Sequence, residues 1–228
     1  MMQDSEVYQI AIDGPSGAGK STVAKALAKA LSLEYIDTGA MYRAVAFKMM
    51  ESRVGLEPIN LLAEMMCDIE LDFSDGRIIL DKRDISGLIR TEQISKLASD
   101  CSAIPVVRER LVAIQRRMGA AKSTVMDGRD IGSNVFPEAR FKFFLTASAE
   151  ERARRRLIDL KQKGAATTLK QVLLDINERD YNDSHRSMNP LIKTDDAEEI
   201  DSTNMTAEEV LTRILCKIRA ELMMERDE

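Results

Sequence analysis

The sequence has few cysteines, and they lie far apart. Cys67, Cys101 and Cys216 are the only three in 228 residues, and none belongs to a Cys-x-x-Cys pair or a Cys/His cluster. This spacing excludes a zinc site of that kind and a disulfide framework. Three unpaired thiols are typical of proteins from a reducing compartment, so we expect a cytoplasmic protein.

Long apolar segments and an excess of basic residues are also missing. No run of about 18 apolar residues occurs, and Met1–Gln9 lacks the basic start and apolar stretch of a secretory signal. We therefore expect no membrane segment. Lysine and arginine number 33 against 38 acidic residues, for a net charge of −5. Because nucleic-acid binders usually carry a basic domain, we expect no nucleic-acid partner.

The chain instead alternates short apolar runs with helical patterns. The predicted helices include Ser21–Leu31, Thr38–Ser52 with Thr38 as its N-cap, Thr91–Ala103, and Val106–Met118 after Pro105. The predicted buried strands are Val7–Ile12, Ser32–Ile36, Thr124–Asp127, Phe141–Leu145 and Ile200–Asp201. Strands that alternate with helices predict a doubly wound α/β sheet of five parallel strands.

Two further features refine this organisation. The stretch from about Ala63 to Thr91 changes character: Ile69–Phe73 alternates apolar and polar residues, a turn signal follows at Ser74-Asp75-Gly76, and Arg77–Leu80 and Lys82–Ile85 resemble further short strands. This stretch therefore predicts a small antiparallel sheet inserted into the α/β pattern. Three later helices begin with capping-box pairs, in which a hydroxyl residue precedes an acidic or amide residue by three positions. The pairs are Ser148 with Glu151, Thr168 with Gln171, and Thr206 with Glu209.

A phosphate-binding motif follows the first predicted strand. Its residues fit the pattern Gly-x-x-x-x-Gly-Lys-Ser/Thr and lead into a helix, as a P-loop requires. Glycines let the backbone N–H groups wrap an anion, Lys20 supplies a charge to the β- and γ-phosphates, and Ser21 can bind Mg²⁺. The expected ATP-binding residues are Gly14, Pro15, Ser16, Gly17, Ala18, Gly19, Lys20, Ser21 and Thr22.

Arginines near predicted strand ends indicate what receives the phosphoryl group. No Asn-Lys-x-Asp guanine-reading motif occurs, which argues against a GTPase. Arg43 and Arg129 follow the second and third strands, where doubly wound sheets place their ligands, so they could clamp a second phosphate. The arginine-rich run Glu151–Arg156 precedes a Gly- and Lys-containing segment, Lys161–Thr168, and together they predict a lid. Arg154 and Arg156 are its expected catalytic arginines, beside Lys20 and Arg129.

Four motifs together resemble those of bacterial cytidylate kinases, a family of P-loop nucleoside monophosphate (NMP) kinases. The resemblance spans about Ile10–Leu222. Its motifs are Ile12–Lys20, Asp37–Arg43, Asp127–Gly132 and Glu178–Asp180.

The resemblance implies transfer of the γ-phosphoryl group of ATP, with Mg²⁺, to CMP or dCMP. The implied acceptor contacts fall on Thr38, Arg43, Ser99, Arg108, Arg129, Asp130, Arg179, Asp183 and Arg186. Among them, Ser99, Arg108 and Asp130 would lie near the cytosine, and Arg179 and Asp183 would hold the sugar. The phosphate would contact Arg43, Arg129 and Arg186. Thr38 stands where the family often has Ser, which keeps the hydroxyl.

The resemblance also implies a division of one kinase domain, 1–228. We expect a core of 1–38, 104–150 and 190–228, an NMP-binding region with the insert at about 39–103, and a lid at about 151–170. We expect a monomer whose partners are its small-molecule substrates. Ser202–Asn204 are candidates for adenine contacts. Two alternatives stay open: a P-loop kinase for another small acceptor such as UMP, and a nucleotide-binding module that does not turn over.

Overall fold

The computed structural model describes residues 7–74, 76–162 and 164–224. Contacts divide the chain into two compact units. Unit 1 contains Ile36–Ser123, and unit 2 contains Tyr8–Tyr35 together with the chain from Thr124 onward. Each unit is described by itself below.

Unit 2 is built on parallel strands. The five-stranded sheet has the order β2-β6-β1-β7-β8, and β1 pairs in parallel with both β6 and β7. Its strands are β1 (Gln9–Asp13), β2 (Glu34–Asp37), β6 (Thr124–Gly128), β7 (Phe141–Thr146) and β8 (Glu198–Asp201). All five predicted strands are therefore present, within a few residues of the expected limits, and the doubly wound α/β prediction is confirmed.

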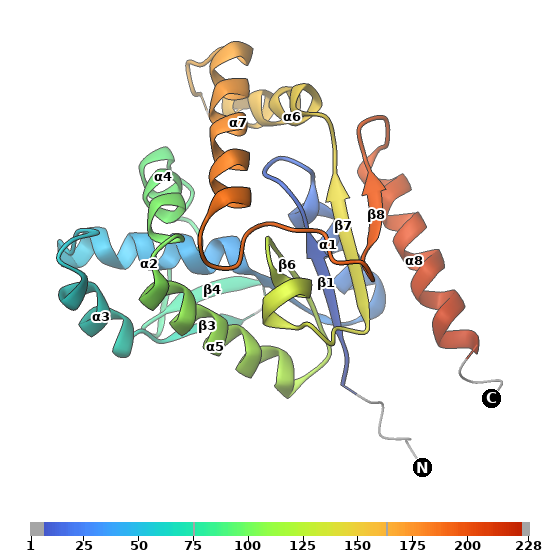
Figure 1. The fold of residues 1–228 in the computed structure, drawn as a ribbon, viewed down its shortest axis with the longest axis horizontal. Coiled ribbons are helices and arrows are strands. Elements are labelled where there is room, and N and C mark those ends of the chain that lie inside the picture. The colour runs from blue at the N-terminus through green and yellow to red at the C-terminus, as the bar shows by residue number, and fades with distance from the viewer. Residues whose placement is uncertain (1–6, 75, 163, 225–228) are drawn as a thin grey trace. The chain divides into compact units, whose positions relative to one another are not determined.

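Helices cover this sheet and extend from it. α1 (Lys20–Leu31) and α8 (Ala207–Met224) pack against each other and share one apolar core with the strands. Ile12, Leu27 and Ile214 are fully buried in that core. α6 (Ala149–Gln162) and α7 (Leu169–His185) form a separate pair (Figure 1). The small core between these two helices contains Ala153 and Val172.

The predicted capping boxes shape three of these helix starts. The Ser148 and Thr168 hydroxyls accept from the backbone N–H groups of Glu151 and Gln171. At α8 the bonding is reciprocal: the Glu209 N–H donates to the Thr206 hydroxyl at 3.2 Å, and the Thr206 N–H donates to the Glu209 carboxylate at 2.8 Å. Local sequence thus fixes these starts because each satisfies amide groups that have no partner within the helix.

Unit 1 combines helices with the inserted sheet. Its helices are α2 (Thr38–Ser52), α3 (Ile59–Cys67), α4 (Glu92–Cys101) and α5 (Pro105–Ala121). The strands β3 (Leu71–Ser74), β4 (Arg77–Leu80) and β5 (Arg83–Asp84) form an antiparallel sheet, as predicted. The turn residue Asp75 lies outside the described residues, as does Lys163 in the predicted lid.

Three local expectations were wrong or incomplete. The N-cap of α2 is Asp37, whose carboxylate accepts from the Ala40 N–H at 2.8 Å, and Thr38 is already helical. Ala63 belongs to α3, which buries Leu62 and Met66 at helical spacing, so the inserted sheet begins later than expected. A π-helical turn, η1 (Ile131–Val135), follows β6 and was not predicted.

Within the described residues, no helix combines the length and apolar character needed to cross a membrane.

Candidate active site

The phosphate loop joins β1 to α1 in unit 2. Its backbone conformation depends on glycine: Gly14 has φ +146°, and an added Cβ would lie 2.0 Å from the Leu145 carbonyl oxygen. Gly19, with φ +91°, is the N-cap of α1, and no side chain caps that helix. The first N–H groups of α1 can therefore receive an anion.

Lys20 is buried at the first position of α1. Its Nζ donates to the Pro15 carbonyl at 2.7 Å, so the side chain folds back over the loop. Burial lowers the pKa of Lys20 to about 7, and the nearby Arg129 guanidinium adds to the shift. The carboxylates of Asp127 and Asp183 act against it. An arriving phosphate would reverse this balance, because its negative charge favours the ammonium form.

Ser21 is joined to an acidic residue from another strand. Its hydroxyl donates to Asp127 Oδ2 at 2.8 Å, and the Tyr35 hydroxyl donates to Asp127 Oδ1 at 2.8 Å. Asp127 is buried near the end of β6. The sequence predicted Ser21 as a Mg²⁺ contact but assigned no role to Asp127. Asp127 lies near the end of β6 and beside the phosphate loop, and only the pairing of β1 with β6 makes that position evident.

The oxygens of Ser21 and Asp127 are hard donors of the type that Mg²⁺ prefers. Among the described residues, no group of three His, Cys, Asp or Glu side chains could hold a metal by itself. This is compatible with Mg²⁺ chemistry, since that ion usually keeps several waters and shares phosphate oxygens instead of occupying an all-protein cage. The pair therefore fits Mg²⁺ delivered with a nucleotide.

Asp13 ties the end of β1 to the turn after β6. Its two carboxylate oxygens accept from the backbone N–H groups of Ile131 at 2.9 Å and Gly132 at 2.7 Å. Burial raises the pKa of Asp13 to about 6, although both hydrogen bonds oppose that shift. These bonds fix the backbone directly after Asp130, a predicted substrate contact. The sequence motifs alone give no sign of this role.

Arg129 and Asp183 form a close ion pair, with 2.6 Å between Nε and Oδ2. Burial disfavours both charges, but the opposite charges around each group together more than offset it. The pKa of Arg129 is raised chiefly by Asp183, and the pKa of Asp183 is lowered by Arg129, Arg179 and Arg186. Both groups are therefore charged at neutral pH.

Asp130 and Arg186 form a second buried pair. Arg186 Nη2 donates to Asp130 Oδ1 at 3.1 Å, and the Asn134 side-chain amide donates to Asp130 Oδ2 at 3.0 Å. Arg186 also donates through Nε to the Asn189 carbonyl at 2.6 Å. Four predicted acceptor contacts thus form two hydrogen-bonded pairs within unit 2. In each pair, one residue follows β6 and the other lies on α7 or at its C-cap.

The other predicted acceptor contacts lie in unit 1. Arg43 pairs with Asp37 at 3.3 Å, and Thr38 is buried at the start of α2. Arg108 is fully buried: its Nη1 donates to the Ser102 carbonyl at 3.2 Å, and its guanidinium lies 5.8 Å from the centre of the Tyr42 ring. Ser99 is half-buried on α4.

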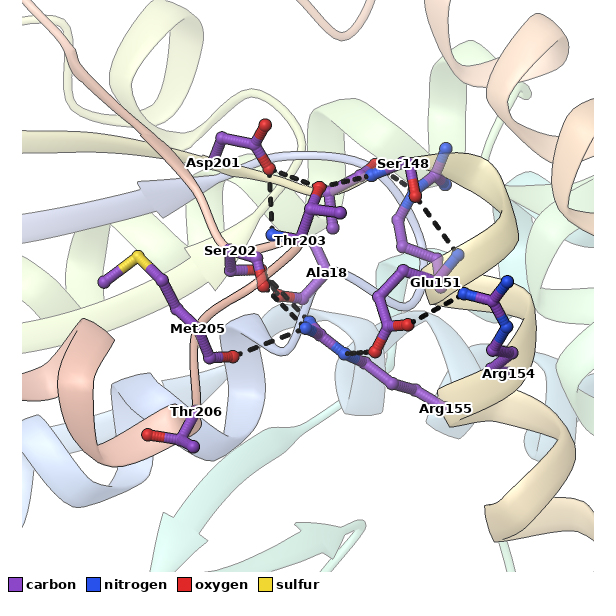
Figure 2. Close-up of polar contacts among 12 residues, drawn as sticks. Ala18, Ser148, Glu151, Arg154, Arg155, Asp201, Ser202, Thr203, Met205 and Thr206 are labelled. Carbon is purple, nitrogen blue, oxygen red and sulfur yellow. Dashed lines mark hydrogen bonds and ion pairs between the residues drawn. The ribbon is translucent and has the colours of Figure 1, made fainter.

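The arginines of α6 divide into two groups. Arg154 and Arg156, the predicted catalytic residues, are exposed, and Arg154 pairs with Glu151 at 3.2 Å. Arg155 instead donates to the Ser202 hydroxyl at 3.0 Å and to the Ser202 carbonyl at 2.6 Å (Figure 2). A run of four arginines could not reveal which members turn inward, because that depends on the packing of α6.

The segment after β8 lies beside the phosphate loop. Ser202 Oγ is 3.4 Å from the Ala18 carbonyl oxygen and 3.0 Å from that of Thr146 (Figure 2). Thr203 accepts from the Ser148 N–H at 2.9 Å. The candidates for adenine contact, Ser202–Asn204, are therefore next to the predicted ATP-binding loop.

Comparison with known proteins adds independent information. Residues 10–220 match the family model described as cytidylate kinase. A relative named cytidylate kinase from Clostridioides difficile is 48% identical over 209 residues, covering 92% of this chain and 97% of the relative. Another of that name, from Caldanaerobacter subterraneus subsp. tengcongensis, is 50% identical over 211 residues, covering 92% and 94%.

A solved structure shares the fold. The crystal structure of an uncharacterized protein from Eubacterium ventriosum matches 94% of this chain and 99% of its own with a TM-score of 0.54. The two sequences are only 15% identical, so this likeness concerns the fold alone.

Proposed function

The chain belongs to the cytidylate kinase family, and we propose that it transfers the γ-phosphoryl group of ATP to CMP or dCMP, giving ADP and CDP or dCDP. The observation that carries the proposal is a formed phosphate loop, with Lys20 buried in it, inside a chain that matches this family over residues 10–220. The loop accounts for ATP, and the family match for the cytidine nucleotide.

On the donor side, the backbone amides of Gly14–Gly19 and the start of α1 would surround the phosphates, with Ser21 and Thr22 at the helix start. Lys20 would exchange its bond to the Pro15 carbonyl for phosphate oxygens. Ser21 and Asp127 would hold Mg²⁺, which when bound neutralises charge on the phosphate oxygens. No general base is needed, since a phosphate acceptor is already an anion at neutral pH.

On the acceptor side, the three proposed phosphate-binding arginines each have a carboxylate partner in this structure. Arg43 pairs with Asp37, Arg129 with Asp183, and Arg186 with Asp130. These ion pairs orient the three guanidinium groups before substrate binds. An acceptor phosphate would then compete with these carboxylates for the arginine donors.

Two of these carboxylates, Asp183 and Asp130, have proposed roles with the rest of the nucleotide. Asp183, with Arg179, would hold the sugar, and Asp130, with Ser99 and Arg108, would contact cytosine. A carboxylate at Asp130 can accept from the cytosine amino group, whereas UMP presents a carbonyl there. The mismatch would cost about 1–3 kcal/mol. Arg154 and Arg156 would add positive charge only if the predicted lid, about 151–170, closes over the substrates.

A panel of acceptors tests the proposal. A coupled assay for ADP, run with CMP, dCMP, UMP and AMP, should show the highest kcat/KM for the two cytidine nucleotides. Equal or higher activity with UMP would contradict the assignment of a cytidine nucleotide as the preferred acceptor and would indicate UMP instead. Lys20→Ala should abolish turnover while circular dichroism shows a retained fold. A wild-type chain that binds ATP but transfers no phosphoryl group to any acceptor would indicate a non-catalytic module.

A further inference from the structure

We propose that Arg152 is a positioning residue that orients the phosphate loop for nucleotide binding. The inference rests on the proposed binding of ATP by that loop. It adds a side chain from helix α6, more than a hundred residues farther along the chain, to the groups on which the loop depends. Arg152 is the one arginine of the Arg152–Arg156 run that is buried.

The Arg152 guanidinium contacts three separate segments. Its Nη1 donates to the Ser16 carbonyl in the loop at 3.0 Å, and its Nε donates to the Ala147 carbonyl at 2.9 Å. Its Nη2 lies 2.7 Å from the Asp180 carboxylate on α7. Because the guanidinium is planar and rigid, holding two of these contacts fixes the direction of the third.

The contact with the Ser16 carbonyl has a consequence for the next amide. In a trans peptide unit the C=O and the following N–H point in opposite directions. Since the Ser16 carbonyl is turned toward Arg152, the N–H of Gly17 is turned away from it. Within the described part of the chain, no group accepts from that N–H, so it is available to a phosphate oxygen.

Packing reinforces this orientation. A Cβ added to Gly17 would lie 3.1 Å from the Arg152 Cβ and 3.2 Å from the Arg152 carbonyl oxygen. The backbone of α6 therefore lies directly against the outside of the loop. The Ser16–Gly17 peptide is held on one side by contact with α6 and through its carbonyl by the guanidinium.

Asp180 makes it possible to bury this arginine. A buried guanidinium needs a nearby negative charge, and the 2.7 Å ion pair supplies one. Replacing Asp180 by Asn removes the negative charge but keeps an oxygen that can accept from Arg152 Nη2, so the guanidinium can still reach the Ser16 carbonyl. The two residues therefore offer a matched comparison: a change at Arg152 removes the loop contact, whereas a change at Asp180 does not.

The test compares ATP and CMP binding by calorimetry, each nucleotide alone, so that no turnover occurs. Arg152→Lys keeps the charge near Asp180 but cannot make the forked contacts, and it should weaken ATP binding about tenfold while CMP binding changes less than about twofold. Asp180→Asn should leave ATP affinity within about threefold of wild type. Thermal melts establish that each variant is folded.

A double variant guards against misfolding. Arg152→Gln with Asp180→Asn removes both charges and leaves neither one buried alone, and it should still bind ATP about tenfold more weakly than Asp180→Asn by itself. Unchanged ATP affinity in the Arg152 variants, or an equal loss for ATP and CMP, would overturn the inference. Failure of the wild-type chain to bind ATP would instead count against the proposed function.

Discussion

The unusual state of Lys20 leads to a quantitative prediction about ATP binding. In the ligand-free protein, burial lowers the pKa of this lysine to about 7 from an ordinary value of 10.5. Bound phosphates should restore the ammonium form, because their charge replaces the solvation that burial removes. ATP binding should therefore take up a proton, and the amount should depend on pH.

The size of the effect follows from the two pKa values. With a pKa of about 7 when free and about 10.5 when bound, uptake is about 0.5 proton per ATP at pH 7 and about 0.9 at pH 8. The bound state carries more protons, so affinity must fall as pH rises. The fall is about twofold from pH 6 to 7 and about ninefold from pH 8 to 9.

Calorimetry in two buffers of different ionisation enthalpy measures this uptake directly, from the difference between the observed binding enthalpies. Lys20→Arg is the matched variant, since a guanidinium keeps its charge throughout this range. It should retain binding and show almost no uptake at pH 8. Uptake below about 0.2 proton in the wild type at pH 8, or equal uptake in Lys20→Arg, would refute the reasoning.

Three further perturbations have definite expected outcomes. Gly14→Ala should lower the free energy of unfolding by at least about 2 kcal/mol more than Gly164→Ala in urea titrations. Both glycines have positive φ, but only at Gly14 would the added Cβ clash with backbone, 2.0 Å from the Leu145 carbonyl oxygen. Thr206→Ala removes the hydroxyl that caps α8 and should cost about 1 kcal/mol in the same titrations, with an effect under about 0.3 kcal/mol counting against that role. Asp127→Asn should raise the Mg²⁺ concentration needed for half-maximal activity by about tenfold or more, and an unchanged Mg²⁺ dependence would exclude Asp127 as its contact.

Short-range sequence patterns predicted most of the fold. The apolar runs specified the strands of the sheet, and Thr206 with Glu209 specified a helix start, because each depends only on neighbours in the chain. Spacing also identified the phosphate loop, since a glycine-rich turn between a strand and a helix needs no distant partner. The helix α3 and the N-cap Asp37 also have local sequence signals, although neither was predicted.

The resemblance to a family supplied the candidate acceptor contacts, and their pairing emerged from the fold. Nothing in the order of residues states that Arg129 meets Asp183 or that Arg186 meets Asp130, because each pair joins β6 or its following turn to the end of α7. The hydrogen bond between Ser21 and Asp127 likewise depends on the pairing of β1 with β6, which lie far apart in the sequence. Their roles toward substrate stay predictions.

The chain's own order of residues settles which groups are present and which local elements they form, since strand, helix and turn preferences act over a few residues. It does not settle the environment of a charged side chain. Lys20 acquires its lowered pKa from burial, and Arg152 becomes the buried member of an arginine run because α6 packs against Gly17. Both outcomes depend on desolvation and on contacts between distant segments, which exist only after the chain has folded.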